Sequence, residues 1–259
     1  MSDVAVRYGG LRLNFRQRLT WLAHLFKALA YQYHKPLAGR LRTLIPSDGV
    51  IVDVGAHSGQ HSKLFAQMAP HGSVYAFEPG GYARSILKIV IGWRRLSNVS
   101  LLGVGLSDRP MSETLHVPLK RSGSMGFGLS HMGAGVTGRE AVSEEVVLTT
   151  LDIFAREQNL SRLDFIKVDI EGWEAHFLRG AKETIARFRP SILIEVVEPI
   201  LRRAGSTPAD VFNELLPLDY LVFETRERED YSMKPVQGLG RAGDYLFVPR
   251  ERADLVAQG

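Results

Sequence analysis

The chain of 259 residues contains no cysteine. This absence excludes disulfide bonds, a thiolate nucleophile and zinc–thiolate sites. No stretch approaches the roughly 18 consecutive apolar residues that a membrane-spanning helix needs. The N-terminus also lacks the uninterrupted apolar run and the small-residue cleavage site of a secretory signal. We therefore expect a cytoplasmic protein.

The chain also lacks a large excess of positive or negative charge. The 32 Lys and Arg residues against 28 Asp and Glu residues leave a formal net charge of +4. This small excess permits an anionic substrate or surface but does not predict nucleic-acid binding. At this length we expect one large domain, or one domain with a small appendage.

Two segments that are present predict a ligand site. Residues 51–59 read Ile-Val-Asp-Val-Gly-Ala-His-Ser-Gly, an apolar run that ends in an acid and continues into a glycine-bearing turn. A second apolar run, Ser73–Phe77, ends in Glu78. Acids at the carboxyl ends of two adjacent parallel strands, about twenty residues apart, are typical of a nucleotide-type site. At this spacing Glu78 can accept hydrogen bonds from two ribose hydroxyls.

The turn has too few glycines for a dinucleotide. The dinucleotide fingerprint is G-x-G-x-x-G, whereas Gly55 and Gly59 are spaced G-x-x-x-G with His57 between them. No Walker lysine follows either, so a ribose-bearing ligand without phosphates fits better, and S-adenosylmethionine is the leading candidate. Histidine tolerates positive φ better than most residues, so His57 can serve the backbone geometry alone. Two buried strands and a turn without a ligand are the alternative.

The N-terminal region has a helical pattern of apolar residues over 11–44, with basic residues between them and a second helix after Pro36. We interpret residues 1–45 as a helical cap on a main domain of residues 46–259. Substrate binding, a partner helix and peripheral contact with a membrane surface are the alternatives.

Strands and helices alternate in the main domain, which predicts an α/β fold with a doubly wound, mostly parallel sheet. The predicted strands are Val50–Val54, Ser73–Phe77, Val99–Val104, Asp164–Val168, Ser191–Val196, Tyr220–Glu224 and Asp244–Val248. The last two are joined without a helix, so we expect them to pair antiparallel. The helix predicted over residues 82–95 is expected to bury Trp93 along with its aliphatic residues.

The alternation stops over residues 107–150, between the third and fourth strands. We expect a β-excursion with strands at Thr114–Leu119 and Val146–Thr150. The glycine-rich segment Ser122–Gly138 between them is interpreted as a flexible lid, because long loops inside compact domains are usually functional or mobile. An unstructured surface insertion is the alternative.

The chain resembles the FkbM family of S-adenosylmethionine-dependent methyltransferases. The matching segments fall in family order over roughly residues 48–225 and are Asp53–Gly59, Ala76–Pro79, Gly105–Asp108, Thr150–Asp152, Phe165–Gly172, Leu178–Gly180 and Arg189–Pro190. The resemblance implies the Rossmann-like class I methyltransferase fold, with a seven-stranded sheet whose last strand is reversed. The family usually has Asn at the position of His57, so the resemblance assigns that side chain no role.

The resemblance also implies roles for the matching positions. The methionine part and ribose of the cofactor would be held by Asp53, Gly55, Ala56, His57 and Gly59. Glu78 would bind the ribose hydroxyls beside Pro79, and Ser107 and Asp108 would lie near the adenine. Family members act on hydroxyls of polyketides, sugars and lipids, so we predict O-methylation of a small hydroxylated molecule. N- or RNA-directed methylation and a catalytically idle cofactor-binding scaffold are the alternatives, and the sequence does not predict the oligomeric state.

The resemblance places Asp169 at the tip of the fourth strand, close to the reactive methyl group. Methyl transfer requires an aligned acceptor, and an alcohol must also lose its proton, for which a carboxylate suffices. We predict Asp169 and Glu171 as catalytic residues, although Glu171 can instead cap the next helix. If the reaction used Mg²⁺, its ligands would be Asp169, Glu195 and Glu198. We favour a reaction without a metal, because the Asp-Asn pair on the fifth strand that such enzymes use is absent.

Overall fold

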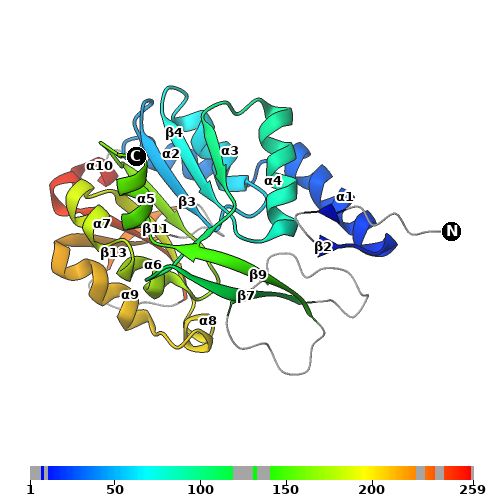
Figure 1. Cartoon of the computed structure of the whole chain (residues 1–259). Coiled ribbons are helices and arrows are strands. Elements are labelled where there is room, and N and C mark those ends of the chain that lie inside the picture. Colours follow the sequence, from blue (N-terminus) through cyan, green and yellow to red (C-terminus); the bar gives the residue numbers. More distant parts are fainter. Residues whose placement is uncertain are drawn as a thin grey trace.

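A computed structural model of the protein describes residues 7–8, 11–118, 131–132, 141–225, 231–236 and 242–257. The centre of the fold is an eight-stranded sheet in the order β13-β12-β14-β11-β10-β3-β4-β5 (Figure 1). These strands are β3 (Val50–Val54), β4 (Ser73–Phe77), β5 (Val99–Leu102), β10 (Phe165–Val168), β11 (Ser191–Val196), β12 (Tyr220–Thr225), β13 (Met233–Val236) and β14 (Gly243–Pro249).

The sheet confirms the predicted fold class. The five strands from β11 to β5 run parallel, whereas β14 lies antiparallel between β11 and β12. The predicted count of seven strands is wrong by one, because β13 adds an antiparallel edge next to β12. This strand has four residues and contains Pro235, which an edge strand tolerates because one of its sides needs no ladder hydrogen bonds.

Helices cover both faces of this sheet, because alternate residues of each strand point to opposite faces. Ile51 packs toward α2 (Lys35–Leu41) and α3 (Gln60–Met68), whereas its neighbour Val52 packs toward the other face. The remaining helices are α1 (Phe15–Ala30), α4 (Gly81–Arg94), α5 (Leu151–Glu157), α6 (Glu174–Arg179), α7 (Lys182–Phe188), α8 (Glu198–Arg203), α9 (Pro208–Leu215), α10 (Asp254–Ala257) and the 3₁₀ turns η1 (Leu216–Leu218) and η2 (Arg250–Arg252).

The expected β-excursion is a second sheet of four strands in the order β6-β9-β7-β8. They are β6 (Gly105–Leu106), β7 (Met111–Pro118), β8 (His131–Met132) and β9 (Ala141–Thr149). Figure 1 shows the long antiparallel pair β7 and β9 reaching out beside the main sheet. Apart from His131–Met132, the lid predicted over Ser122–Gly138 lies outside the described residues.

The periodicity predicts a helix that begins at residue 11, but the structure has no helix at this position. A two-stranded pair of β1 (Arg7–Tyr8) and β2 (Leu11–Arg12) comes first. Helix α1 then begins after Asn14, whose side chain accepts from the backbone N–H of Gln17 while the Gln17 side chain accepts from that of Asn14. This reciprocal capping box satisfies two N–H groups that a helix start leaves unpaired.

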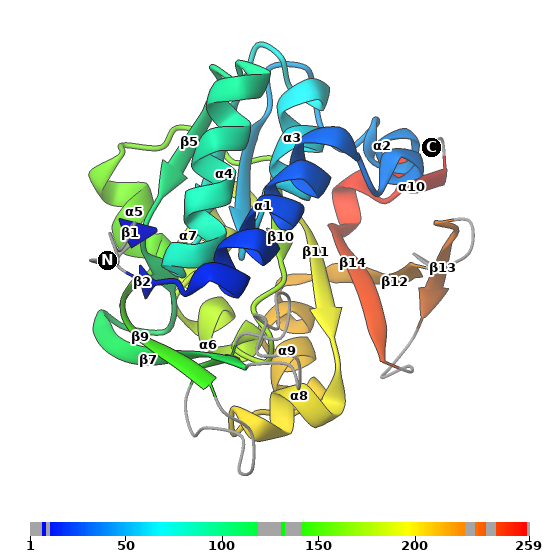
Figure 2. The ribbon, with the colours of Figure 1, turned by 90° about the vertical axis from the view of Figure 1, so that its right-hand side faces the viewer.

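Helix α1 lies alongside α4 (Figure 2). The expectation that Trp93 is buried is wrong, because the residue is 74% exposed near the end of α4, where no other element covers it. Among the described residues, no helix is both long enough and apolar enough to cross a membrane.

Candidate active site

A cavity of about 370 Å³ opens at the carboxyl ends of β3, β4 and β10. Its size lies within the range of about 300–1,000 Å³ that is usual for small-molecule sites. The sheet order reverses between β3 and β10, and ligands of open α/β sheets bind at such a switch point. The lining residues come from the turn after β3, the end of β4, the tips of β10 and β11, the excursion strands and His34.

The turn after β3 is shaped by backbone conformation. Gly55 has φ +80°, and a Cβ at this position would lie 1.9 Å from the carbonyl oxygen of Asp169. His57 has φ +51° and Gly59 has φ +85°. The prediction that His57 occupies a position of positive φ is therefore confirmed. Burial lowers the pKa of His57 to about 4, so its imidazole is neutral at physiological pH.

Glu78 closes this turn from β4. Its two carboxylate oxygens accept from the backbone N–H groups of His57 and Gly80, each at 2.8 Å. Burial raises the pKa of Glu78 to about 7 despite these two hydrogen bonds. Ala56 and Pro79, the neighbouring residues predicted for the cofactor, also line the cavity.

Asp53 lies underneath the cavity and does not line it. Its carboxylate accepts from Ser62 Oγ at 2.5 Å, and the residue is 1% exposed. Burial raises the pKa of Asp53 to about 6. Asp53 therefore ties the end of β3 to helix α3, which begins directly after the turn.

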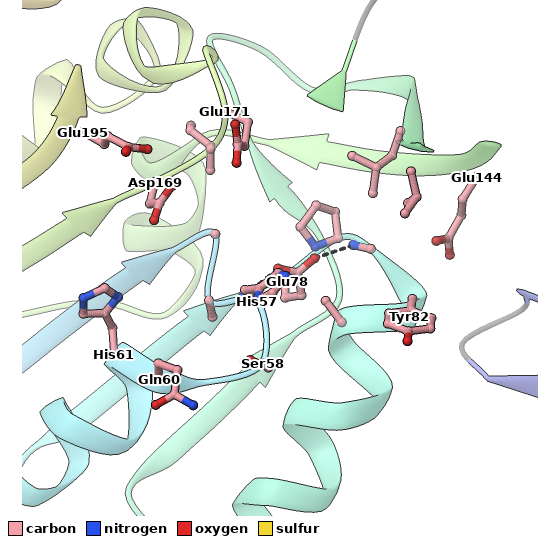
Figure 3. A pocket seen from close by; sticks show the side chains of 18 of the residues that line it. His57, Ser58, Gln60, His61, Glu78, Tyr82, Glu144, Asp169, Glu171 and Glu195 are labelled. Atoms are coloured by element: carbon pink, nitrogen blue, oxygen red, sulfur yellow. Dashed lines mark hydrogen bonds between the residues drawn. The ribbon is translucent and has the colours of Figure 1, made fainter. Parts of the chain in front are cut away.

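The tip of β10 brings three carboxylates to one end of the cavity. Asp169, Glu171 and Glu195 gather there in Figure 3, with Glu195 contributed by β11. Glu171 has a left-handed backbone (φ +54°), which is uncommon outside glycine, and its side chain lines the cavity. The backbone N–H groups of Ile170 and Gly172 donate to Glu174 Oε1, so Glu174 rather than Glu171 accepts hydrogen bonds at the start of the next helix.

Burial and the nearby charge of Asp169 favour the protonated forms of Glu171 and Glu195. Burial, together with the nearby charge of Asp169, raises the pKa of Glu171 to about 7. The same two causes raise the pKa of Glu195 above its usual range. Near neutral pH, these side chains can therefore donate as well as accept hydrogen bonds.

A lysine inside strand β10 supports this cluster. The Lys167 side chain is 3% exposed, and its ammonium lies 3.4 Å from Asp244 Oδ1 and 3.9 Å from Asp169 Oδ2. The sequence interpretation assigns Lys167 no chemistry. A charged residue within an otherwise apolar strand is the signal that would have pointed to it, because buried charges are rarely left without partners.

The opposite end of the cavity is formed by residues that sequence reasoning did not select. Figure 3 places Tyr82 and Glu144 on the far side of Glu78 from Asp169. Glu144 reaches in from β9 and accepts from the backbone N–H of Gly81 at 2.8 Å. Leu115 and Val117 of β7 line the same cavity. The excursion is therefore part of the site.

Four other predicted residues lie outside the cavity lining, namely Gly59, Ser107, Asp108 and Glu198. Ser107 accepts from Trp173 Nε1 at 2.9 Å, and Asp108 lies 3.5 Å from His176 Nδ1. Glu198 pairs with Arg202 on the surface and does not join Asp169 and Glu195. Within the described part of the chain, no group of three or more His, Cys, Asp or Glu residues is arranged to hold a metal ion.

The reversed strand β14 and a cavity at the carboxyl ends of β3, β4 and β10 define the class I methyltransferase fold. A model of the methyltransferase FkbM domain matches residues 53–225, which is more than half of the chain. The chain therefore belongs to the FkbM methyltransferase family.

Three known proteins illustrate this membership. The 2-O-methyltransferase NoeI of Sinorhizobium fredii (strain NBRC 101917 / NGR234) is 26% identical, over 82% of this chain and 89% of that protein. The AMB antimetabolite synthetase AmbE of Pseudomonas aeruginosa (strain PAO1) is 28% identical over 80% of this chain, which spans only 11% of AmbE. The crystal structure of an FkbM methyltransferase from Methylobacillus flagellatus KT superposes with a TM-score of 0.52 at 14% identity, covering 93% of this chain and 62% of that one.

Proposed function

We propose that this protein is an S-adenosylmethionine-dependent O-methyltransferase that acts on an uncharged small molecule rich in hydroxyl groups. The observation that carries the proposal is the charge of the cavity. Its described lining includes five carboxyl groups and no lysine or arginine; the five belong to Glu78, Glu144, Asp169, Glu171 and Glu195. An anionic acceptor such as a phosphorylated sugar would find no lysine or arginine in this lining to pair with its charge.

The same lining suits the cofactor. S-adenosylmethionine carries a sulfonium and an ammonium against one carboxylate, so it enters an acidic cavity as a net cation. Glu78 offers its carboxylate for the ribose hydroxyls, and Gly55 lets the turn pack directly against the Asp169 carbonyl because it has no side chain.

The order of residues along the cavity supports one orientation. With the ribose held by Glu78, Asp169 would lie at the methionine end of the cofactor, and Tyr82, Leu115 and Glu144 would hold its adenine. The adenine pocket would then be built by α4 and the excursion, whereas the resemblance implied Ser107 and Asp108. An aromatic ring and aliphatic side chains suit a purine base better than the hydrogen-bonded Ser107 pair does.

Asp169 is proposed as the residue that aligns the acceptor and accepts its proton. When bound, S-adenosylmethionine supplies an electrophilic methyl group. The acceptor hydroxyl donates a hydrogen bond to the Asp169 carboxylate, which takes the proton as the oxygen attacks. The ammonium of Lys167 lies 3.9 Å from Asp169 Oδ2 and helps to hold that carboxylate in position. Protonated Glu195 and Glu171 hold other hydroxyls of the acceptor by donating to them.

The test is a methyl-transfer screen with labelled S-adenosylmethionine and paired acceptors, each neutral sugar or polyol beside its phosphorylated form. We expect transfer to the neutral member of a pair. Asp169→Asn should lower the rate by about 100-fold or more while cofactor binding measured by calorimetry stays intact. Glu198→Gln, which changes an acid outside the cavity, is the matched control and should behave like wild type. Failure to bind the cofactor at all would contradict the proposal.

A further inference from the structure

Helix α1 exposes a stripe of large apolar residues. Phe15, Leu19, Leu22 and Phe26 are 74%, 51%, 54% and 65% exposed. They follow one another at four-, three- and four-residue steps, so they share one side of the helix. The opposite side is the one that packs on the protein, through Trp21 and Ala28. A single exposed leucine is ordinary, but a whole stripe of this kind marks an interaction surface.

The charged residues of α1 and of its neighbour α4 are all basic. Helix α1 contains arginines and a lysine but neither Asp nor Glu, and there is no acid in the sequence between Asp3 and Asp48. The neighbouring helix α4 also contains no acid, and it exposes Trp93, Lys88 and Arg94. An apolar stripe with only cations beside it is the pattern of a helix that lies in a lipid interface.

From this combination, we propose that the exposed side of α1 binds the surface of a lipid bilayer that carries anionic headgroups. Phe15, Leu19, Leu22 and Phe26 would enter the boundary between headgroups and acyl chains. Arg16 and Lys27, both exposed, would contact the headgroup charges. The helix would lie in the plane of the surface without crossing it.

The charges distinguish this partner from a second copy of the chain. A symmetric contact places the same surface patch on both subunits. Two copies of α1 would therefore face each other with cations and no acid to pair with them, which is unfavourable. An anionic bilayer supplies the missing charge over the whole length of the helix.

The proposed surface lies one helix away from the cavity. His24 Nδ1 is 3.0 Å from the hydroxyl of Tyr82, which lines the cavity. At the other end of α1, Gln32 Nε2 donates to the carbonyl oxygen of Gln60 at 2.9 Å, and Gln60 also lines the cavity. Docking would therefore hold the methyl-transfer site close to the bilayer surface.

The test is co-sedimentation of the full chain with phosphatidylcholine vesicles that contain or lack phosphatidylglycerol. We expect binding to the anionic vesicles, and about tenfold weaker binding when phosphatidylglycerol is omitted or the salt concentration is high. The triple variant L19Q/L22Q/F26Q should have an affinity for the anionic vesicles that is lower by about tenfold or more. The pair R16E/K27E should lose the dependence on phosphatidylglycerol.

Matched controls are available elsewhere on the surface. Leu216→Gln changes an exposed leucine of η1, and Lys234→Glu changes an exposed lysine of β13; both should bind vesicles like wild type. Thermal melting and cofactor binding check that each variant is folded. The proposal would be overturned if the wild-type protein did not co-sediment with anionic vesicles. A wild-type dimer that L19Q/L22Q/F26Q converts to monomer would also overturn it, because the stripe would then belong to a second copy.

Discussion

The turn after β3 and the tip of β10 lie next to each other at the cavity, but they are held in place by different means. The turn depends on backbone conformation, with Gly55 so close to the Asp169 carbonyl that no Cβ fits between them. The tip depends on charge, with Lys167 set between Asp169 and Asp244. The turn should therefore be sensitive to added atoms and the tip to changed charges.

The largest effect is expected at the turn. Gly55→Ala combines a steric overlap with a strained φ, so we expect it to lower the free energy of unfolding by about 2 kcal/mol or more. Cofactor affinity should fall by about 100-fold, because the overlap pushes the turn and the β10 tip apart. Chemical denaturation and calorimetry measure the two effects.

Gly92→Ala is the control for that substitution. Gly92 lies within α4, and an added Cβ would meet nothing within 4 Å. Here alanine should raise stability by about 0.5–1 kcal/mol, because it favours the helix over the unfolded chain. If both alanine variants behaved alike, backbone geometry would not explain the turn.

The next largest effect is expected from Lys167→Met. The variant leaves Asp244 and Asp169 without their buried cation, which should cost about 3 kcal/mol of stability. Chemical denaturation measures this loss. Lys182→Met removes a cation that is 60% exposed beside Glu214, and we expect a change of less than about 1 kcal/mol. Equal losses in the two variants would argue against a special role for Lys167.

A smaller effect is expected in the pH dependence of stability. The pKa of Glu171 is about 7 in the folded protein because of burial, against 4.5 as its ordinary value. The folded state thus binds more protons than the unfolded state between these two values, so stability falls as pH rises from about 4.5 to about 7. Glu171→Gln should flatten this part of the profile in thermal melts, whereas Glu157→Gln on the exposed side of α5 should leave the slope unchanged.

The smallest effect is expected at His57. Asparagine also tolerates positive φ, so His57→Asn should change stability by less than about 0.5 kcal/mol and keep cofactor affinity near wild type. His57→Val puts a β-branched residue at φ +51° and should cost about 1–2 kcal/mol. A large loss of turnover in His57→Asn with unchanged binding would show that the imidazole itself takes part in the reaction.

The sequence predicted the turn better than the rest of the site, for a physical reason. Glycines and an acid at the end of an apolar strand indicate a tight turn, and the conformation of such a turn depends on residues that are neighbours in the sequence. The antiparallel pairing of Asp244–Val248 was equally readable, because no helix is predicted between this strand and the one before it. The Thr207 cap and Pro208 at the start of α9 are local signals of the same kind.

The missed residues depend on contacts between distant segments. Glu144 reaches the cavity only because β9 pairs with β7, which also lines the cavity, and nothing near Glu144 in the sequence signals this. Trp93 was expected inside because tryptophan is usually buried, but the helical pattern does not show which neighbours a helix end has. Strand β13 is too short to show any period.

The buried ammonium of Lys63 links the N-terminal segment to the turn. Lys63 belongs to α3, is 2% exposed, and donates to the carbonyl oxygens of Ala28 and Tyr31 at 2.6 and 2.7 Å. These carbonyls are among those that the end of a helix leaves unpaired, so α1 and α3 satisfy each other's polar groups. A shortened chain starting at residue 46 would remove both acceptors and uncover the apolar residues of α3 that pack against residues 37–45. The first 45 residues are therefore a poor place to trim the protein for crystallisation or engineering, even though the family match begins only at Asp53.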